Sequence, residues 1–176
     1  MRMHLGRMAA VCVVLAGLTM SAGAQFNRSD RSSAEVGINT VHAPVPDPLL
    51  KGKKAFISYE LGDVTAFPSS YSGGPERAYA EFYAQMQAWD RYQLVSDPKD
   101  ADVVFAVRFV DPPAIPHPQI RIGVSDPHGR VSLWGFVEEV NFAFFKKHRD
   151  AAFTETVKEL INDVKVLVDP TAPPAH

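Results

Sequence analysis

The sequence predicts one α+β domain, a two-layer sandwich in which two helices cover one face of a mostly antiparallel sheet. Two segments carry apolar residues at helical spacing, and several short segments carry them in β-rich or alternating runs. A turn signature joins two of the strand segments as a hairpin. With 176 residues, 46% of them hydrophobic, the chain has one-domain length and can fill a core. The predicted order is β-α-β-β-β-β-α.

The first predicted helix follows a strand over residues 55–59 and a glycine-rich loop over residues 69–74. Pro75 suits its first position, because proline has no amide hydrogen to leave unpaired there. A short second strand over residues 92–95 comes after the helix and is closed by Asp97-Pro98. Apolar residues of the helix recur at i, i+3, i+4, i+7 and i+10, and they are Tyr79, Phe82, Tyr83, Met86 and Trp89.

The next three predicted strands cover residues 102–110, 119–125 and 130–140. Between the last two, the segment 126–129 (DPHG) has Asp, Pro and Gly at the positions that a type I turn prefers, so we expect a hairpin. A helix over residues 149–168 ends the order, with an apolar stripe from Phe153 to Val168. The residues expected to be fully buried are Phe82, Trp89, Phe105, Ile122, Phe153 and Leu160.

Residues 1–24 have the pattern of a cleavable secretory signal peptide. Arg2 and Arg7 precede an uncharged apolar run over residues 8–20, and Ala22-Gly23-Ala24 supplies the small residues that signal peptidase accepts. The run is shorter than the ~20 residues that span a bilayer. We therefore expect a periplasmic or extracellular protein, with an uncleaved membrane anchor as the alternative.

Four segments follow from this pattern: the signal peptide, a flexible tether over residues 25–50, the folded domain over 51–168, and a disordered tail over 169–176. Without the leader, 16 basic and 20 acidic residues remain. An acidic balance gives no electrostatic footprint for nucleic acid or an anionic bilayer, and we expect no stable membrane insertion after cleavage. The single cysteine, Cys12, lies in the leader, so disulfides and thiol catalysis are not expected.

Several segments carry a resemblance to a known family. The helix 77–89 (RAYAEFYAQMQAW), the stretch 91–105 with its Asp-Pro and Ala-Asp steps, and the hairpin 120–134 (IRIGVSDPHGRVSLW) resemble uncharacterised secreted proteins of acidobacteria-type genomes. More distantly, they are similar to envelope lipoprotein domains of unknown function and to the amino-terminal domain of TolB-like proteins. The resemblance covers about residues 54–168, and it implies no activity or catalytic residue.

No motif predicts a metal, a cofactor or a nucleophile. The histidines lack the i, i+4 spacing of a zinc helix, and no G-x-S-x-G occurs. Asp97, Asp100 and Asp102 fit a turn that enters a strand better than a calcium loop, which needs a closing glutamate. The glycines before Pro75 lack the Lys-Ser/Thr of a phosphate loop. We expect no cofactor.

The favoured interpretation is a non-enzymatic exported module that binds a protein or an envelope component through the free sheet face or the loop 60–75. The candidate contact residues are Trp134, Phe136 and Tyr71, because aromatic side chains suit binding surfaces. This expectation turns Trp134 and Phe136 away from the helices and Leu133 and Val137 toward them, although the opposite phase of the strand also fits the sequence. The alternative function is a hydrolase or small-ligand enzyme whose groups assemble only in three dimensions, for example Asp63, His117 and His128.

Overall fold

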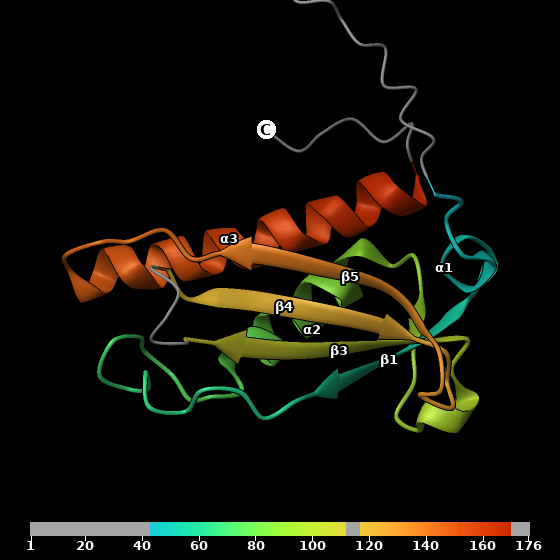
Figure 1. Cartoon of the computed structure of the whole chain (residues 1–176), viewed down its shortest axis with the longest axis horizontal. Helices are drawn as coiled ribbons and strands as arrows, with labels where there is room; N and C mark the ends of the chain where they lie inside the picture. The colour runs from blue at the N-terminus through green and yellow to red at the C-terminus, as the bar shows by residue number, and fades with distance from the viewer. Residues whose placement is uncertain (1–42, 112–116, 170–176) are drawn as a thin grey trace, which may run out of the picture. The chain divides into compact units, whose positions relative to one another are not determined.

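The computed structural model describes residues 43–111 and 117–169 (Figure 1). The predicted signal peptide, most of the predicted tether and nearly all of the predicted tail lie outside this part of the chain. The observed order confirms β-α-β-β-β-β-α and adds a short helix in front. The elements are α1 (Asp47–Lys51), β1 (Lys54–Tyr59), α2 (Arg77–Trp89), β2 (Gln93–Leu94), the 3₁₀ turn η1 (Pro98–Asp100), β3 (Val103–Val110), β4 (Gln119–Ser125), β5 (Ser132–Glu139) and α3 (Lys146–Val168).

The five strands form one sheet in the order β2-β1-β3-β4-β5. β1 is parallel to β2 and to β3, whereas β3, β4 and β5 form long antiparallel ladders. The parallel pairs arise because α2 carries the chain back across the sheet after β1. Helices α2 and α3 contact each other and the sheet, and α2 lies behind the strands in Figure 1. The predicted α+β architecture is therefore confirmed.

The core fills the space between the helices and the sheet. Alternation along β3 and β4 turns one side of each strand toward the helices, and these side chains are almost completely buried. Five of the six residues expected to be fully buried are at most 1% exposed, whereas Trp89 packs against the core but is only half-buried. The five are Phe82, Phe105, Ile122, Phe153 and Leu160.

Both long helices begin elsewhere than the sequence predicts. α2 starts at Arg77 rather than Pro75, because the chain first makes a turn in which the Arg77 amide donates to the Gly74 carbonyl at 3.0 Å. α3 starts at Lys146, three residues before the predicted Arg149. The residue at which a helix begins depends on how its first backbone groups are capped, and the spacing of apolar residues does not determine this.

The described end of the predicted tether is helical. Within α1, Leu49 is 0% exposed, and its carbonyl accepts a hydrogen bond of 2.6 Å from the Tyr92 hydroxyl. Arg91 donates to the carbonyls of Leu50 and Gly52. The folded unit therefore begins before residue 51, and the sequence hid this because Pro44, Pro46 and Pro48 resemble a linker.

The hairpin between β4 and β5 forms where its turn signature predicts. The Gly129 amide donates to the Asp126 carbonyl at 2.9 Å, and Gly129 has a φ of +63°, which glycine adopts without strain. The Asp126 carboxylate accepts from the amides of Val131 and Arg130 at 2.7 and 2.8 Å. These hydrogen bonds lower the pKa of Asp126, led by the one from Val131, and they fix the turn.

Candidate functional site

The strand register settles the phase of β5. Trp134 lies opposite Val124 and Phe136 lies opposite Ile122, and antiparallel partners point to the same face of a sheet. Val124 and Ile122 are buried under the helices, so Trp134 and Phe136 also face them and are half-buried against the core. The expected phase was wrong and the opposite one is observed. A contact role for the two aromatic residues stays a prediction.

A β-bulge explains why the sequence did not predict which face of the sheet each β5 side chain lies on. It lies where Val124 and Ser125 face β5 and adds one residue to that strand, which shifts every following side chain to the other face. Leu133 lies in this irregular stretch and packs partly against the core. Val137 is 52% exposed on the free face.

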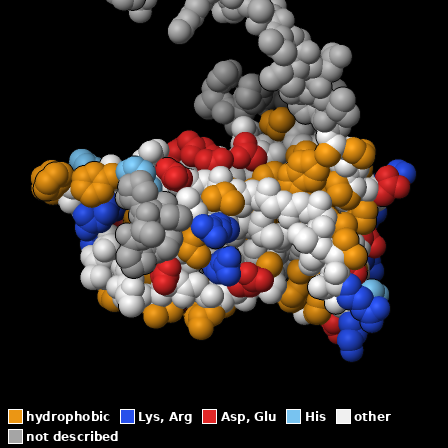
Figure 2. Space-filling view, in the orientation of Figure 1, with side chains coloured by type: hydrophobic (Ala, Val, Ile, Leu, Met, Phe, Trp, Pro, Cys, Tyr) orange, Lys and Arg blue, Asp and Glu red, His pale blue; other side chains and the backbone are white. Residues whose placement is uncertain are grey.

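Figure 2 views the free face of the sheet, where charged side chains lie near the centre and one row across four strands is made of small residues. Ser58, Ala106, Gly123 and Gly135 are successive partners across four strands, so short side chains or none cover this row. An added Cβ at Gly123 would meet no atom within 4 Å. The expected aromatic patch of Trp134 and Phe136 is therefore not on this face.

The residues of the enzymatic alternative do not converge. His117 precedes β4 and His128 follows it, so a strand of seven residues, roughly 20 Å, lies between them. Asp63 lies at the His117 end, where its carboxylate accepts from the Asp111 amide at 2.6 Å. Among the described residues, no group of three or more His, Cys, Asp or Glu side chains could hold a metal ion.

The acids near β3 have structural partners. Asp102 accepts hydrogen bonds from the amides of Lys53 and Lys54 at 2.7 and 2.9 Å, and these lower its pKa. Asp97 caps η1 by accepting from the Lys99 amide at 2.9 Å. The interpretation of these acids as a turn entering a strand is confirmed.

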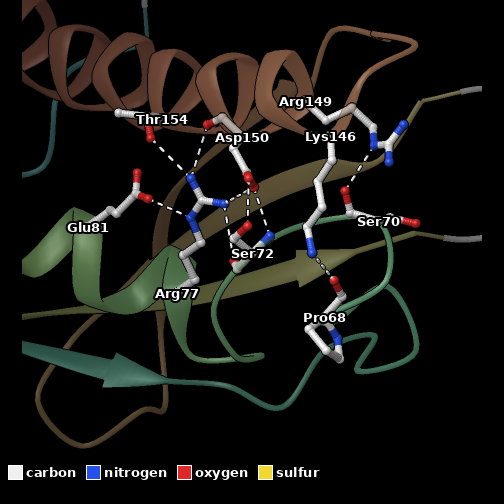
Figure 3. A network of polar contacts seen from close by, with 9 residues as sticks. All are labelled: Pro68, Ser70, Ser72, Arg77, Glu81, Lys146, Arg149, Asp150 and Thr154. Atoms are coloured by element: carbon white, nitrogen blue, oxygen red, sulfur yellow. Dashed lines mark hydrogen bonds and ion pairs between the residues drawn. The ribbon is translucent and has the colours of Figure 1, made fainter.

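The glycine-rich loop before α2 already holds a carboxylate of the chain itself (Figure 3). Asp150 of α3 accepts from the Ser72 amide and the Ser72 hydroxyl, both at 2.7 Å. Arg77 donates to Asp150 at 2.6 Å, to Glu81 at 2.6 Å and to Thr154 at 3.2 Å. Its guanidinium also stacks 4.4 Å from the centre of the Phe153 ring. This network fixes the loop to both helices.

Two cations at the start of α3 hold the preceding part of the loop 60–75. Arg149 donates to the Ser70 carbonyl at 2.9 Å, and Lys146 donates to the Pro68 carbonyl (Figure 3). These hydrogen bonds hold the loop 60–75, which the sequence predicts to be a contact segment, against the start of α3.

Tyr71 is a core residue of this loop. It is 3% exposed, and its ring packs against those of Phe67, Phe109 and Phe153. Burial raises the pKa of Tyr71, with a further contribution from Asp111. Its remaining surface lines a pocket of about 250 Å³, together with Ser70, Asp111, Pro118, Phe142 and Arg149. Partner contact by Tyr71 stays a prediction.

The segment after β5 exposes three phenylalanines. Phe142, Phe144 and Phe145 are 71%, 84% and 70% exposed. The next three residues, Lys146, Lys147 and His148, are basic or titratable and also exposed, and Arg149 follows. We call residues 142–149 the aromatic-basic tip.

The sequence contains a local signal for this tip that is separate from the periodic patterns of the helices and strands. The run FAFFKKHR places three aromatic residues directly before four basic or titratable ones. The acidic balance of the whole chain, from which the sequence predicts no electrostatic footprint for an anionic surface, conceals this local cluster.

The backbone of the tip is fixed at both ends. Val140 is 0% exposed, and its amide donates to the Pro118 carbonyl at 2.7 Å. Arg149 donates to the Phe144 carbonyl at 2.8 Å and to the Ala143 carbonyl at 3.3 Å. The three aromatic side chains are therefore presented on an anchored loop.

The tip breaks two ordinary rules of stability. α3 begins without a side-chain cap and without an acid in its first turn, while cations stand at the positive end of the helix. Three large apolar side chains also face water. Local violations of this kind mark sites that serve function rather than folding.

A second exposed feature is the edge of the sheet that β2 and β1 form. β2 pairs only with Lys54 and Ala55, so no strand among the described residues pairs with the outer edge of β1 from Phe56 to Tyr59. On this side the Ala55 carbonyl accepts from the Val95 amide, and on the other side the Glu60 amide donates to the Val107 carbonyl of β3. Because the backbone groups of successive strand residues point to opposite edges, the amides of Ile57 and Tyr59 point outward. A groove of about 580 Å³ adjoins this edge and is lined by Tyr59, Tyr79, Tyr83 and Leu94, among others.

No helix within residues 43–111 and 117–169 is both long and apolar enough to cross a membrane.

The comparisons with known proteins identify no family. No protein-family model matches the chain, and neither does any curated protein. One solved structure that matches is described as a minor lipoprotein from Acinetobacter baumannii; it is 11% identical, with a TM-score of 0.33, and the match covers 70% of this chain and 98% of that one. A likeness of this degree carries no argument about function, and the resemblance to secreted acidobacterial proteins finds no support in these comparisons.

Proposed function

We propose that the chain is a non-enzymatic exported module that docks onto a component of the cell envelope through the aromatic-basic tip. One observation carries this proposal: Phe142, Phe144 and Phe145 are each at least 70% exposed on an anchored loop. Export rests on the leader pattern of residues 1–24.

The three aromatic side chains are a source of free energy for association. The ring centroids of Phe142 and Phe144 lie 5.9 Å apart, and those of Phe145 and His148 also lie 5.9 Å apart, so the tip carries two adjacent ring pairs. Burying a phenylalanine side chain completely contributes roughly 1.5–3 kcal/mol. Three of them supply roughly 4.5–9 kcal/mol before the cost of association is subtracted, compared with the ~8 kcal/mol of a micromolar complex.

The test compares the natural chain with a triple variant, Phe142→Ser, Phe144→Ser and Phe145→Ser, both exported by a secreting bacterium. After cell breakage, we expect the natural protein to pellet with the envelope membranes and the triple variant to shift to the soluble fraction. Equal pelleting of the two proteins contradicts the proposal.

The matched control removes exposed apolar side chains elsewhere. Val131 is 54% exposed in the β4–β5 turn, and Val166 is 43% exposed near the end of α3, which at 1.5 Å per residue is about 30 Å from Lys146. The double variant Val131→Ser, Val166→Ser should pellet like the natural protein. A shift of this control to the soluble fraction shows non-specific adhesion and removes support for the tip.

A second candidate function is capture of an extended peptide along the open edge of β1, which the unpaired amide of Tyr59 favours. Tyr59→Pro removes that amide donor at the end of an edge strand, where proline is tolerated, and Tyr59→Thr retains it. On an array of alternating apolar and polar peptides, we expect the threonine variant to bind and the proline variant to fail. Equal binding by both variants excludes pairing through the edge.

A further inference from the structure

The cations of the aromatic-basic tip indicate what kind of surface it meets. Lys146, Lys147 and His148 are exposed and directly follow the three phenylalanines. No ion pair among the described residues engages any of the three. The charges of the two lysines are available to an external anion, and the apolar side chains before them are available to an external apolar phase.

We propose that the tip docks onto a lipid surface with anionic headgroups, an inference that rests on the proposed function and names its partner. Phe142, Phe144 and Phe145 enter the boundary between headgroups and acyl chains. Lys147 and His148 meet the headgroup phosphates, with Lys146 beside them. The protein lies on the surface and does not span it.

The dimensions of the tip fit such a surface. Residues 146–149 make up the first turn of α3, which rises about 5.4 Å, so the cations lie within about one turn of the aromatic side chains. Apolar side chains of interfacial segments enter roughly 5–10 Å into the headgroup and acyl boundary, with basic groups above them. One short segment therefore supplies both layers of contact.

Two of the cations also set the position of the tip. Arg149 is engaged with the carbonyls of Ser70, Ala143 and Phe144, and Lys146 with that of Pro68. These contacts order the loop before binding, which lowers the entropy lost on docking. Lys147 makes no such contact with the described residues and is the cation best placed to report headgroup binding.

The charge distribution favours a single orientation. The whole chain has 20 acidic and 18 basic residues, yet four basic or titratable residues are concentrated in positions 146–149. An anionic surface attracts the tip and repels the acidic remainder, so approach is tip-first.

The experiment measures flotation of the full chain without its leader on two kinds of vesicle, phosphatidylcholine alone and phosphatidylcholine with phosphatidylglycerol. We expect tighter binding to the anionic vesicles, weakened by added salt. Lys147→Gln should lower affinity for the anionic vesicles about fivefold, because one lysine near such a surface is worth about 1 kcal/mol. The same variant should leave the weak binding to phosphatidylcholine unchanged, and the triple serine variant should lose at least tenfold on the anionic vesicles.

Lys99→Gln is the matched lysine control, since Lys99 is exposed in η1. It should bind like the natural protein, and circular dichroism should show that every variant is folded. Equal binding to both kinds of vesicle, or equal loss in Lys99→Gln and Lys147→Gln, overturns the inference. If the natural protein floats with neither vesicle while the triple variant still leaves the envelope pellet, the lipid inference is wrong and the proposed function stands with a protein partner.

Discussion

Arg77 and Asp150 form an ion pair of 2.6 Å that joins the first residue of α2 to the beginning of α3. Their side chains are 14% and 23% exposed, so the pair lies largely out of water. Because Asp150 also binds Ser72 and lies one residue after Arg149, this pair connects the helix packing to the base of the aromatic-basic tip.

Asp150→Asn should lower the free energy of unfolding by about 2 kcal/mol, between the values for exposed and buried ion pairs. Arg77 would keep Glu81 but lose the second of its two carboxylate partners, and Ser72 of the loop would lose its charged acceptor. Urea unfolding measures the change. Asp47→Asn breaks the exposed Lys51 pair, with side chains 74% and 70% exposed, and should change stability little. Equal effects of the two substitutions would show that the Arg77 network contributes no more than a surface pair.

The contribution of Asp150 should disappear in acid. Burial opposes its charge, but hydrogen bonds from Ser72 and Arg77 outweigh this and hold its pKa below the ordinary value. A lowered pKa gives stability that is present above the ordinary pKa and is lost as pH falls through the lowered one. The difference between the natural protein and Asp150→Asn should be constant near neutral pH and shrink below about pH 4. A difference that persists at lower pH would contradict this origin.

Glu138 should show the opposite dependence. Burial raises its pKa, and the acids Asp163 and Glu159 of α3 raise it further. A raised pKa gives stability that is present in acid and is lost as pH rises through it. Glu138→Gln imitates the protonated form and should raise stability at pH 7 by roughly 0.5 kcal/mol, with no gain in acid. Thermal unfolding at both pH values checks this, and the exposed Glu60→Gln serves as control; a gain that is the same at both pH values would exclude the pKa as its cause.

Phe153→Ala should cost about 3–5 kcal/mol, as expected for a large core cavity. The Phe153 ring is 0% exposed and contacts Phe67, Tyr71 and Phe109, besides the Arg77 guanidinium. Phe144→Ala, at an 84% exposed position, should leave the urea midpoint nearly unchanged. A similar loss in both variants would mean that the tip is part of the folding core.

The architecture could be predicted from the sequence because its signals are local and periodic. The apolar stripe of α3 and the turn at Asp126 each act through neighbouring residues, and both formed as expected. Which face of the sheet Trp134 lies on depends on a bulge between β4 and β5, and the spacing of apolar residues gives no sign of that bulge. The helix at Leu49 is held by Tyr92 and Arg91 from a distant segment, which single-sequence reasoning does not see.

The candidate site was the least predictable part. Tyr71 is 3% exposed because it packs with Phe67 of its own loop and with aromatic residues of two distant elements, Phe109 of β3 and Phe153 of α3. The phenylalanines at 142, 144 and 145 differ from expectation in the opposite direction: they are exposed, whereas large apolar residues between a strand and a helix are ordinarily expected to be buried. Only the structure shows that nothing among the described residues covers them.

Fluorescence of Phe144→Trp tests most directly that the tip itself enters the surface. The difference spectrum against the natural protein isolates this residue from Trp89 and Trp134, which are half-buried in the fold. On addition of phosphatidylglycerol-containing vesicles, its emission should move to shorter wavelength and become quenched by brominated acyl chains. Emission that keeps its aqueous wavelength while the protein is bound to the vesicles would contradict docking through the aromatic-basic tip.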